Sequence, residues 1–506
     1  MKYVNANLTI HSALGVGVML VLLGISFLLM WLVLGGAGLV SSRLLKPLLV
    51  LMAFCNAVAL YAMQTYQVIL DKSMMGNVIN TDRGESMALF HPKLLVYLLV
   101  VAAASVVLFR YVRIEPQSRL KKFGHLVLAV LLSLALVYLN SSAWLWVDKH
   151  AKMIGGLLLP WSYTVNAARY LNDQKSASLQ LLPLPELSWA LADGLPVTVV
   201  LVIGESARAQ NFSLLGYTRQ TNPLLEKRDR MWVQTAQACS TYTTRSMECI
   251  LSHDPSASRL THEILPNYLH RSGQVQVLWR ARNWGEPKLQ LDHVLRGKQL
   301  AALCVAPDCK HPDQDESLLA GLQTEISQAS HDKQLIVLHQ AGSHGPAYNQ
   351  KYPPEFSRFE PACDTVDLKK CGRQALVNAY DNSILYTDHF LDQLIGLLER
   401  QTQRRTVMIF VSDHGESLGE GGWYLHGAPD MLAPQEQLKI PFLVWTSPSF
   451  AQARASKSAA LASGTGQSSG SPAALGQHQI FHSVLGALGG QSPIYRAELD
   501  VFQMSR

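Results

Sequence analysis

The sequence predicts an α-helical membrane domain followed by an α/β domain that is built on a largely parallel sheet. Two observations support this prediction. Long apolar runs occupy the first 147 residues, whereas short apolar runs alternate with helical patterns from about residue 196 onward. The chain of 506 residues is also longer than a single hydrophobic core usually organises, so at least two domains are expected.

Four apolar segments are long enough to cross a bilayer, which needs about 20 apolar residues. They cover roughly 13–36, 46–68, 94–112 and 124–146. The first has one lysine before it and no small-residue cleavage pattern, so a cleaved signal peptide is not expected. Basic residues in short loops predict the cytoplasmic side, and they gather in the loops after the first and third segments: Arg43, Lys46, Arg110, Arg113, Arg119, Lys121 and Lys122.

This orientation places the N-terminus and everything after residue 147 outside the cytoplasm. The cysteines point to the same side, because six of the seven follow residue 230 in three close pairs and no CxxC zinc motif occurs. Such pairs favour disulfides and therefore an oxidising compartment. Cys55 lies inside an apolar run and is expected to be buried.

The chain is expected to divide into an anchor (1–147), a bridge (148–195) and a catalytic domain (196–506). Within the bridge, residues 153–171 are apolar and aromatic with few charges, which fits a helix at the membrane surface or an ordinary linker helix. Residues 455–476 are rich in Ala, Ser and Gly and are expected to form a flexible surface loop.

Five short apolar runs in the last part of the chain predict buried strands. They are Val197–Ile203, Gln276–Trp279, Leu335–His339, Thr406–Ser412 and Pro441–Trp445, and a helical pattern covers Leu376–Glu399. Alternating strands and helices predict a largely parallel sheet covered by helices on both faces. Functional groups in such sheets collect at the carboxyl ends of the strands.

Polar motifs follow three of these strands directly. The first strand is followed by Glu205, the third by a segment that contains His344, and the fourth by Asp413, His414 and then His426. Carboxylates and imidazoles together favour zinc, with manganese as a weaker candidate. The sequence therefore predicts a metal site at this edge of the sheet.

A metal site of this kind can activate a hydroxyl nucleophile that is held in a constrained turn. The segment 239–249 offers such a turn, because cysteines stand at both of its ends and hydroxyl side chains lie between them. Residue chemistry alone leaves five candidates open: Ser240, Thr241, Thr243, Thr244 and Ser246.

These motifs resemble those of the phosphoethanolamine transferases of Gram-negative bacteria, within the alkaline phosphatase and sulfatase superfamily. The resemblance runs from about residue 45 to 500. It rests on 66–71, MMGNVINTDRGES (74–86), GESARAQNFSLLGYTRQTNP (204–223), the 239–249 segment, GSHGP (342–346), YDNSILYTD (380–388), SDHGESLGE (412–420) and YLHG (424–427). It implies an α/β/α sandwich for the catalytic domain.

The resemblance also implies roles for single residues. Thr243 becomes the nucleophile, and the zinc ligands become Glu205, Thr243, Asp413 and His414. His344 and His426 would face the bound phosphate or a second metal. The implied disulfides are Cys239–Cys249, Cys304–Cys309 and Cys363–Cys371.

Three features depart from the family pattern. The loop after the Trp279 strand lacks the cysteine pair that members acting on lipid A usually carry, and Asn283 and Lys288 would fill the substrate-contacting positions at an altered spacing. Met247 and Glu248 replace the usual Val-Pro. Many relatives have five spans, and the first of these is missing among the four predicted here.

The expected activity is transfer of phosphoethanolamine from phosphatidylethanolamine to a cell-envelope acceptor, through a covalent intermediate on Thr243 and with release of diacylglycerol. Lipid A, a core sugar of lipopolysaccharide and a periplasmic glucan remain open as acceptors. The enzyme is expected in the inner membrane as a monomer, with its catalytic domain in the periplasm. A net charge of +6 without a basic, aromatic-rich stretch gives no support for nucleic-acid binding.

Two other functions fit the same motifs. A phosphodiesterase or phosphatase of the superfamily would use water as the acceptor, although the C/S-x-P-x-R motif of sulfatases does not occur. A membrane-tethered sensor that has kept the fold is the non-enzymatic alternative. Only a transferase would stall after one turnover without its acceptor.

Overall fold

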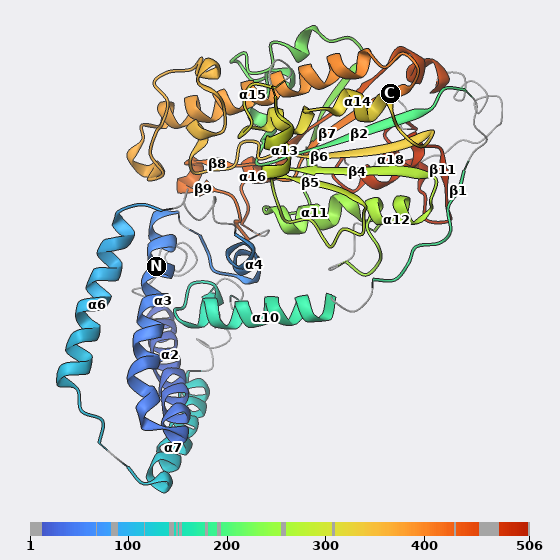
Figure 1. Ribbon diagram of the computed structural model, residues 1–506. Coiled ribbons are helices and arrows are strands. Elements are labelled where there is room, and N and C mark those ends of the chain that lie inside the picture. Colours follow the sequence, from blue (N-terminus) through green and yellow to red (C-terminus); the bar gives the residue numbers. More distant parts are fainter. Residues whose placement is uncertain are drawn as a thin grey trace. The chain divides into compact units, whose positions relative to one another are not determined.

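The computed structural model describes residues 13–66, 68–81, 90–115, 117–140, 146–147, 150, 154–177, 181–189, 194–254, 260–305, 309–429, 432–454 and 475–503. The chain divides into two compact units (Figure 1). One comprises Met1–Val78 and Phe90–Asn172, and the other comprises Ile79–Leu89 and Asp173–Arg506. The predicted loop at 455–476 falls outside the described residues, except for its last two, as do residues 82–86 of the family motif.

The first unit is helical. Its helices are α2 (Ala13–Val40), α3 (Leu45–Thr65), α4 (Lys72–Asn80), α6 (Lys93–Tyr111), α7 (Arg119–Leu139) and α10 (Trp161–Ala177). Among the described residues, four stretches are long and apolar enough to cross a membrane: Gly15–Val40, Ser42–Thr65, Lys93–Tyr111 and Arg119–Leu139. Many of their large apolar side chains are exposed, as expected for helices whose solvent is lipid.

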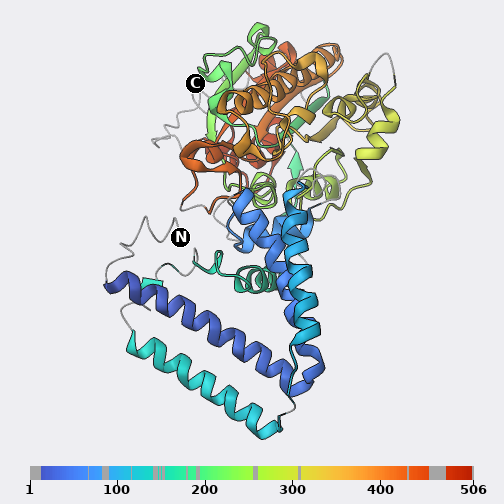
Figure 2. The same cartoon turned by 90° about the vertical axis from the view of Figure 1, so that its left-hand side faces the viewer.

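The four long helices pack in two pairs. Helix α2 lies along α7 and α3 lies along α6 (Figure 2). At one end of these pairs, Lys122 Nζ donates hydrogen bonds to Gly38 O (2.5 Å) and to Ser42 Oγ (2.8 Å). Lys46 Nζ donates to Phe109 O at 3.2 Å. The two basic loops therefore lie at the same end of the helices, as the predicted orientation requires.

Three local predictions for this unit were wrong. The fourth span begins at Arg119 and ends at Leu139, because the Ser118 side chain caps its start by accepting from Lys121 N. The bridging helix α10 begins at Trp161 and ends at Ala177, later than the predicted 153–171; residue 153 lies outside the described residues, and a short helical segment at 154–155 ends before proline 160. Cys55 is exposed because it lies on an outward face of α3.

The second unit contains the predicted sheet. The strand order in the seven-stranded sheet is β3–β10–β7–β2–β6–β4–β5, and only β10 runs antiparallel to its neighbours. The strands are β2 (Val197–Gly204), β3 (Met231–Gln237), β4 (Val275–Ala281), β5 (His293–Arg296), β6 (Lys333–His339), β7 (Arg405–Ser412) and β10 (Lys439–Thr446). Two short ladders pair β1 (Ser188–Trp189) with β11 (Gly490–Gln491) and β8 (Ser417–Leu418) with β9 (Tyr424–Leu425).

Helices cover both faces of this sheet, as Figure 1 shows. Alternate residues of the strands, such as Val199 and Leu201 of β2, pack in one core with α11 (Thr243–Leu251), α12 (Leu265–Arg271) and α18 (Gln479–Ala487). The long helix α15 (Arg373–Glu399) covers the other face. Further helices of this unit are α13 (Gly297–Leu303), α14 (Leu322–Ser327) and α16 (Gln435–Leu438).

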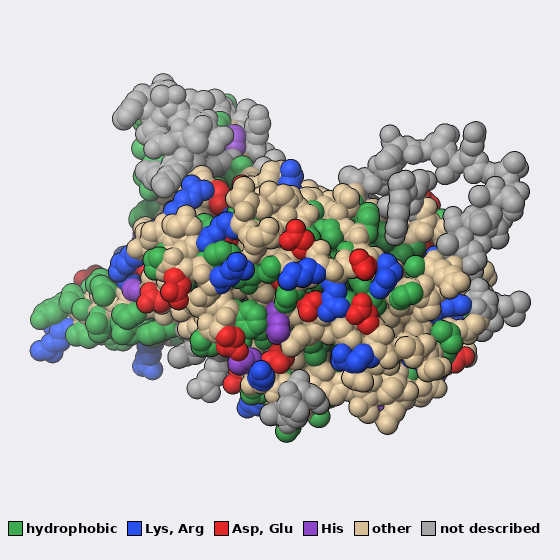
Figure 3. All heavy atoms as spheres, turned by 90° about the horizontal axis from the view of Figure 1, so that it is seen from above, with side chains coloured by type: hydrophobic (Ala, Val, Ile, Leu, Met, Phe, Trp, Pro, Cys, Tyr) green, Lys and Arg blue, Asp and Glu red, His purple; other side chains and the backbone are tan. Residues whose placement is uncertain are grey.

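The predicted fold class is confirmed, with two strands added. The five predicted strands correspond to β2, β4, β6, β7 and β10. The sequence did not predict β3, in which one of seven residues is buried, or β5, which has four residues; both are edge strands with weak apolar patterns. Basic and acidic side chains intermingle over the face seen in Figure 3, in keeping with the small net charge.

Candidate active site

The carboxyl ends of four neighbouring parallel strands bring the predicted residues together. Glu205 follows β2, and Asp413 and His414 follow β7, which pairs with β2 up to Gly204 and Ser412. Asn283 lies just beyond β4, and His344 lies beyond β6. All these strands run in the same direction, so their ends meet at one edge of the sheet.

A close backbone contact fixes the segment that follows β6. Ser343 N donates to Glu205 O at 2.9 Å, and the carboxylate of Asp315 accepts from Ala341 N and Gly342 N at 2.8 and 2.9 Å. Gly342 has a φ of +49°, and a Cβ there would lie 2.6 Å from Glu205 O. Only glycine allows this approach, which brings the segment carrying His344 against Glu205.

Thr243 is the first residue of α11 and is buried. Its Oγ1 donates to Glu205 Oε2 at 3.0 Å and lies 3.3 Å from His414 Nε2. The other hydroxyl groups of the turn have different surroundings: Thr241 Oγ1 donates to Ala428 O at 2.6 Å, and Ser246 Oγ donates to Ser240 O at 3.4 Å. Geometry therefore favours Thr243 among the five candidates.

Disulfides join the six cysteines of this unit in the pairing that the family resemblance implies. The pairs are Cys239–Cys249, Cys304–Cys309 and Cys363–Cys371. The first bridges a sequence separation of 10 and encloses Thr243. A covalent closure of this kind restricts the turn and the start of α11.

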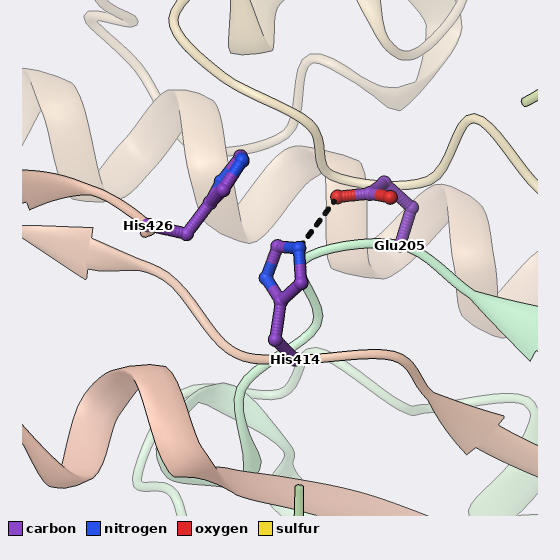
Figure 4. A group of neighbouring side chains, drawn as sticks. All are labelled: Glu205, His414 and His426. Carbon is purple, nitrogen blue, oxygen red and sulfur yellow. Dashed lines mark ion pairs between the residues drawn. The ribbon is translucent and has the colours of Figure 1, made fainter. Parts of the chain in front are cut away.

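Among the described residues, three side chains form a group that could hold a metal ion. They are Glu205, His414 and His426, whose donor atoms all lie within 4.8 Å of one another (Figure 4). His414 Nε2 lies 3.4 Å from Glu205 Oε1 and 3.3 Å from Asp413 Oδ2. Asp413 Oδ2 is buried without a hydrogen-bond partner in the structure. An unpaired buried carboxylate oxygen beside an imidazole fits a divalent cation.

The hydrogen bond made by the second ring nitrogen, Nδ1, fixes the tautomer of His414. His414 Nδ1 lies 2.9 Å from Gly415 O. A carbonyl oxygen can only accept, so Nδ1 carries the proton and the Nε2 lone pair points into the site. Metal-binding histidines usually donate the N–H of their other ring nitrogen to a carbonyl or carboxylate oxygen in this way.

Burial dominates the electrostatics of the site. Burial lowers the pKa of His414 to about 3, and the nearby His426 adds to this shift. Burial and the negative charge of Glu205 hold the pKa of Asp413 well above its usual range. A cation between these groups would offset the repulsion of the two carboxylates.

His426 belongs to this group, and His344 borders it. The rings of His414 and His426 have centroids 4.2 Å apart, and those of His344 and His426 are 5.1 Å apart. His426 Nδ1 lies 3.3 Å from Glu416 Oε1, and Glu416 is fully buried. The imidazoles of His344 and His426 therefore lie on one side of the Glu205–His414 pair, where a phosphoryl group could contact them.

The loop after β4 brings Asn283 but not the Lys288 side chain to Glu205. Asn283 Nδ2 donates to Glu205 Oε2 at 2.7 Å. Lys288 is exposed, and the contact that holds it runs from Asn267 Nδ2 to its backbone carbonyl at 3.0 Å. Between them, Gly285 has a φ of +102°, and a Cβ there would lie 3.1 Å from Thr243 Cγ2.

The carboxylate of Glu286 anchors this loop to the sheet. It forms an ion pair with Arg296 at the end of β5, and Oε2 lies 3.8 Å from Nδ1 of the buried His339 at the end of β6. Burial raises the pKa of Glu286, but His339 and Arg296 outweigh this effect and lower it to about 2. The charged carboxylate is thus stabilised in the folded state.

We expect Glu286→Gln to lower stability by about 2–3 kcal/mol at neutral pH. Because the folded pKa lies below the ordinary value of 4.5, this stabilisation is present above that value and is lost as the pH falls toward about 2. Thermal unfolding from pH 7 down to pH 3 would test it, with the exposed Glu498→Gln as control. A pH-independent difference between Glu286→Gln and wild type would contradict the assignment.

Several residues of the site were not predicted. Glu416 belongs to the DHGE motif, so its signal was present in the sequence. Ser206, whose Oγ donates to Glu205 Oε1 at 2.6 Å, belongs to the motif at 204–223, so its signal was present as well, whereas Asp315 and Glu286 come from positions without a distinctive pattern.

Family models match both parts of the chain. The model described as "Sulfatase" matches residues 197–490, and the one described as "Phosphoethanolamine transferase EptA/EptB" matches residues 15–175. The first covers the whole seven-stranded sheet, and the second covers the long helices of the first unit.

Individual proteins are similar over nearly the whole chain. The phosphoethanolamine transferase EptA of Helicobacter pylori is 39% identical over 473 residues, which cover 92% of this chain and 87% of that protein. The integral membrane protein lipooligosaccharide phosphoethanolamine transferase A from Neisseria meningitidis matches with a TM-score of 0.83 and 28% identity, covering 99% of this chain and 94% of its own. The C-terminal periplasmic domain of phosphoethanolamine transferase EptC from Campylobacter jejuni matches with a TM-score of 0.52 and 32% identity, covering 64% of this chain and 97% of its own.

Proposed function

This chain belongs to the phosphoethanolamine transferase family, and from that premise we propose that it moves phosphoethanolamine from phosphatidylethanolamine to lipid A through a covalent intermediate on Thr243. The observation that carries the proposal is the contact of the Thr243 hydroxyl with both Glu205 and His414. A lipid A acceptor agrees with the lipooligosaccharide named for the Neisseria meningitidis enzyme.

The first half-reaction begins at the Thr243 hydroxyl. Its oxygen attacks the phosphorus of phosphatidylethanolamine, an O–P bond forms, and the bond from phosphorus to the diacylglycerol oxygen breaks. The hydroxyl proton points toward Glu205 Oε2, which accepts it at 3.0 Å in the resting arrangement. Diacylglycerol leaves after its oxygen has taken up a proton, which His344 or His426 would donate.

In the second half-reaction, the Thr243 oxygen is the leaving group instead of the attacking group. A phosphate or hydroxyl oxygen of the acceptor attacks the phosphorus and the bond to Thr243 breaks. The side chains of His344 and His426 would contact the phosphoryl oxygens in both steps, where donors lower the energy of the transition state. Asn283, which donates to Glu205, would hold that carboxylate in place throughout.

We further propose that the metal is zinc, in one site with a second site open. Glu205, Asp413 and His414 would hold it, with Thr243 as the fourth ligand. The unpaired Oδ2 of Asp413 supports this set, whereas the group of donor atoms within 4.8 Å of one another contains His426 in place of Asp413. When bound, zinc supplies a positive charge that lowers the pKa of the hydroxyl and offsets phosphoryl charge. The rest of the site orients these groups around it.

The proposed location is the Gram-negative inner membrane, with residues 1–147 as anchor, 148–195 as bridge and 196–506 as periplasmic catalytic domain. The basic loops at one end of the helices and the three disulfides support this orientation. A donor that is itself a bilayer lipid explains the need for an anchor. The proposed oligomeric state is a monomer.

Mass spectrometry of lipid A from cells with and without this chain tests the function. We expect lipid A to gain phosphoethanolamine only when the chain is produced. Unmodified lipid A, together with modified periplasmic glucans or core sugars, would reject the proposed acceptor. Continuous release of free phosphoethanolamine by purified enzyme without any acceptor would favour the hydrolase.

Asn283 and Lys288 are expected to differ in their kinetic effects. Asn283→Ala removes a hydrogen bond to Glu205, so kcat should fall by about tenfold. Lys288 is exposed and stands where the family resemblance implies a substrate contact, so Lys288→Ala should raise KM with little change in kcat. Steady-state kinetics of both variants with phosphatidylethanolamine would measure the separate effects on kcat and KM. A normal kcat for Asn283→Ala would contradict its proposed role.

A further inference from the structure

Gln477 is a fully buried glutamine that lies two residues before α18. Its segment runs beside the end of β3, where Gln237 N donates to Leu475 O at 2.9 Å and Gln237 forms a bridge with Gly476. The described contacts of Gln477 therefore come from a part of the chain that the metal and phosphate motifs do not include.

Both atoms of the Gln477 side-chain amide are bonded to backbone groups. Oε1 accepts from Cys239 N at 2.8 Å, while Nε2 donates to Ser412 O at 2.9 Å and also to Asp413 O. Carbonyl oxygens only accept and an amide N–H only donates, so the amide can adopt only this orientation.

These contacts join two segments that must stay in register for the proposed chemistry. Cys239 opens the disulfide-closed turn, and Thr243 follows four positions later. Asp413 begins the segment after β7 that also carries His414. Gln477 thus spans directly from the turn that bears the nucleophile to the strand end that bears the proposed ligands.

A neutral amide suits this position because the neighbouring carboxylates are already repelling one another. Glu205 and Asp413 are both buried, and a further charge nearby would shift the pKa values of these carboxylates. Glutamine donates and accepts at once without adding charge. We propose that Gln477 is a positioning residue, which sets the separation between the Thr243 hydroxyl and the Asp413–His414 segment; this inference rests on the proposed function.

The test compares two substitutions at Gln477 with a matched control. Gln477→Met keeps the length of the side chain and removes all three hydrogen bonds, whereas Gln477→Glu keeps the acceptor and turns an oxygen toward two carbonyls. The control is Gln334→Met, since Gln334 is also fully buried and bonded through both amide atoms, to Thr198, Gln276 and Glu325. Gln334 is the second residue of β6, so it lies at the amino ends of the parallel strands, whereas the site lies at their carboxyl ends.

The measurement is the rate at which full-length enzyme in detergent forms the phosphoethanolamine adduct on Thr243 in a single turnover. A displacement of about 1 Å can cost on the order of 100-fold in rate. We expect Gln477→Met and Gln477→Glu to slow adduct formation at least about tenfold, with KM for phosphatidylethanolamine changed less than about twofold. Gln334→Met should lower the Tm but keep the rate within about twofold.

Two results would overturn the inference. One is a wild-type rate of adduct formation in a folded Gln477 variant. If Gln477→Met does not fold, Gln477→Glu alone decides this outcome. The other is an equal loss of rate in Gln334→Met at a similar Tm, which would mean that general stability explains the effect. Absence of the adduct in the wild-type enzyme would instead reject the proposed function, so the two failures are distinguishable.

Discussion

Thr243→Ala is expected to lower phosphoethanolamine transfer by at least about 1000-fold, because it removes the atom to which the transferred group would bind. The Oγ1 atom contacts Glu205 and His414, and no other hydroxyl of the described turn has both contacts. The fold should persist, since the Cys239–Cys249 disulfide and the buried residues of α11 remain. Steady-state transfer to lipid A in detergent would measure the loss.

Thr243→Ser is the matched control because it keeps the hydroxyl and removes only Cγ2, which packs near Gly285. We expect this variant to retain measurable transfer. Full activity in Thr243→Ala would mean that another group accepts the phosphoethanolamine, and the mechanism would then be wrong.

Removal of metal is expected to have the second-largest effect. Chelation should lower transfer by at least about 100-fold, because the buried carboxylates of Glu205 and Asp413 would lose the charge that balances them. Zinc should restore the activity and magnesium should not, since imidazole and carboxylate together favour zinc. The Tm should also fall on chelation, because a ligand that binds only the folded state stabilises it.

Asp413→Asn provides the control for this experiment. It removes the charge of the carboxylate while keeping an oxygen that can accept from Ser206 N and His414 N. We expect its metal content to fall together with its activity. A chelated, metal-free enzyme that works at the wild-type rate would exclude the proposed metal role.

The parts of the fold that could be predicted are those with a strong local pattern. β2 and β7 are almost wholly buried, so each reads as a continuous apolar run. β3 was not predicted because only one of its seven residues is buried and several of its side chains are polar. Helix ends were misplaced where one residue decides them, as at Ser118 and proline 160.

The predictable part of the site is the set of residues that directly follow strands. Strand direction alone explains why Glu205 and the Asp413–His414 pair meet at one edge. The choice of Thr243 from five hydroxyls depended on the family resemblance, and the structure adds a geometric reason for it. Gln477 and Glu286 could not be predicted, because their partners lie far away in sequence and no local pattern marks such contacts.

The most direct test of the central claim follows the ethanolamine group itself. Full-length enzyme is mixed with phosphatidylethanolamine labelled in its head group, without acceptor, and the proteolysed protein is examined by mass spectrometry. We expect one phosphoethanolamine on the peptide containing Thr243 and its loss when lipid A is added. Label on a different residue, or free phosphoethanolamine accumulating with an unmodified Thr243 peptide, would contradict it.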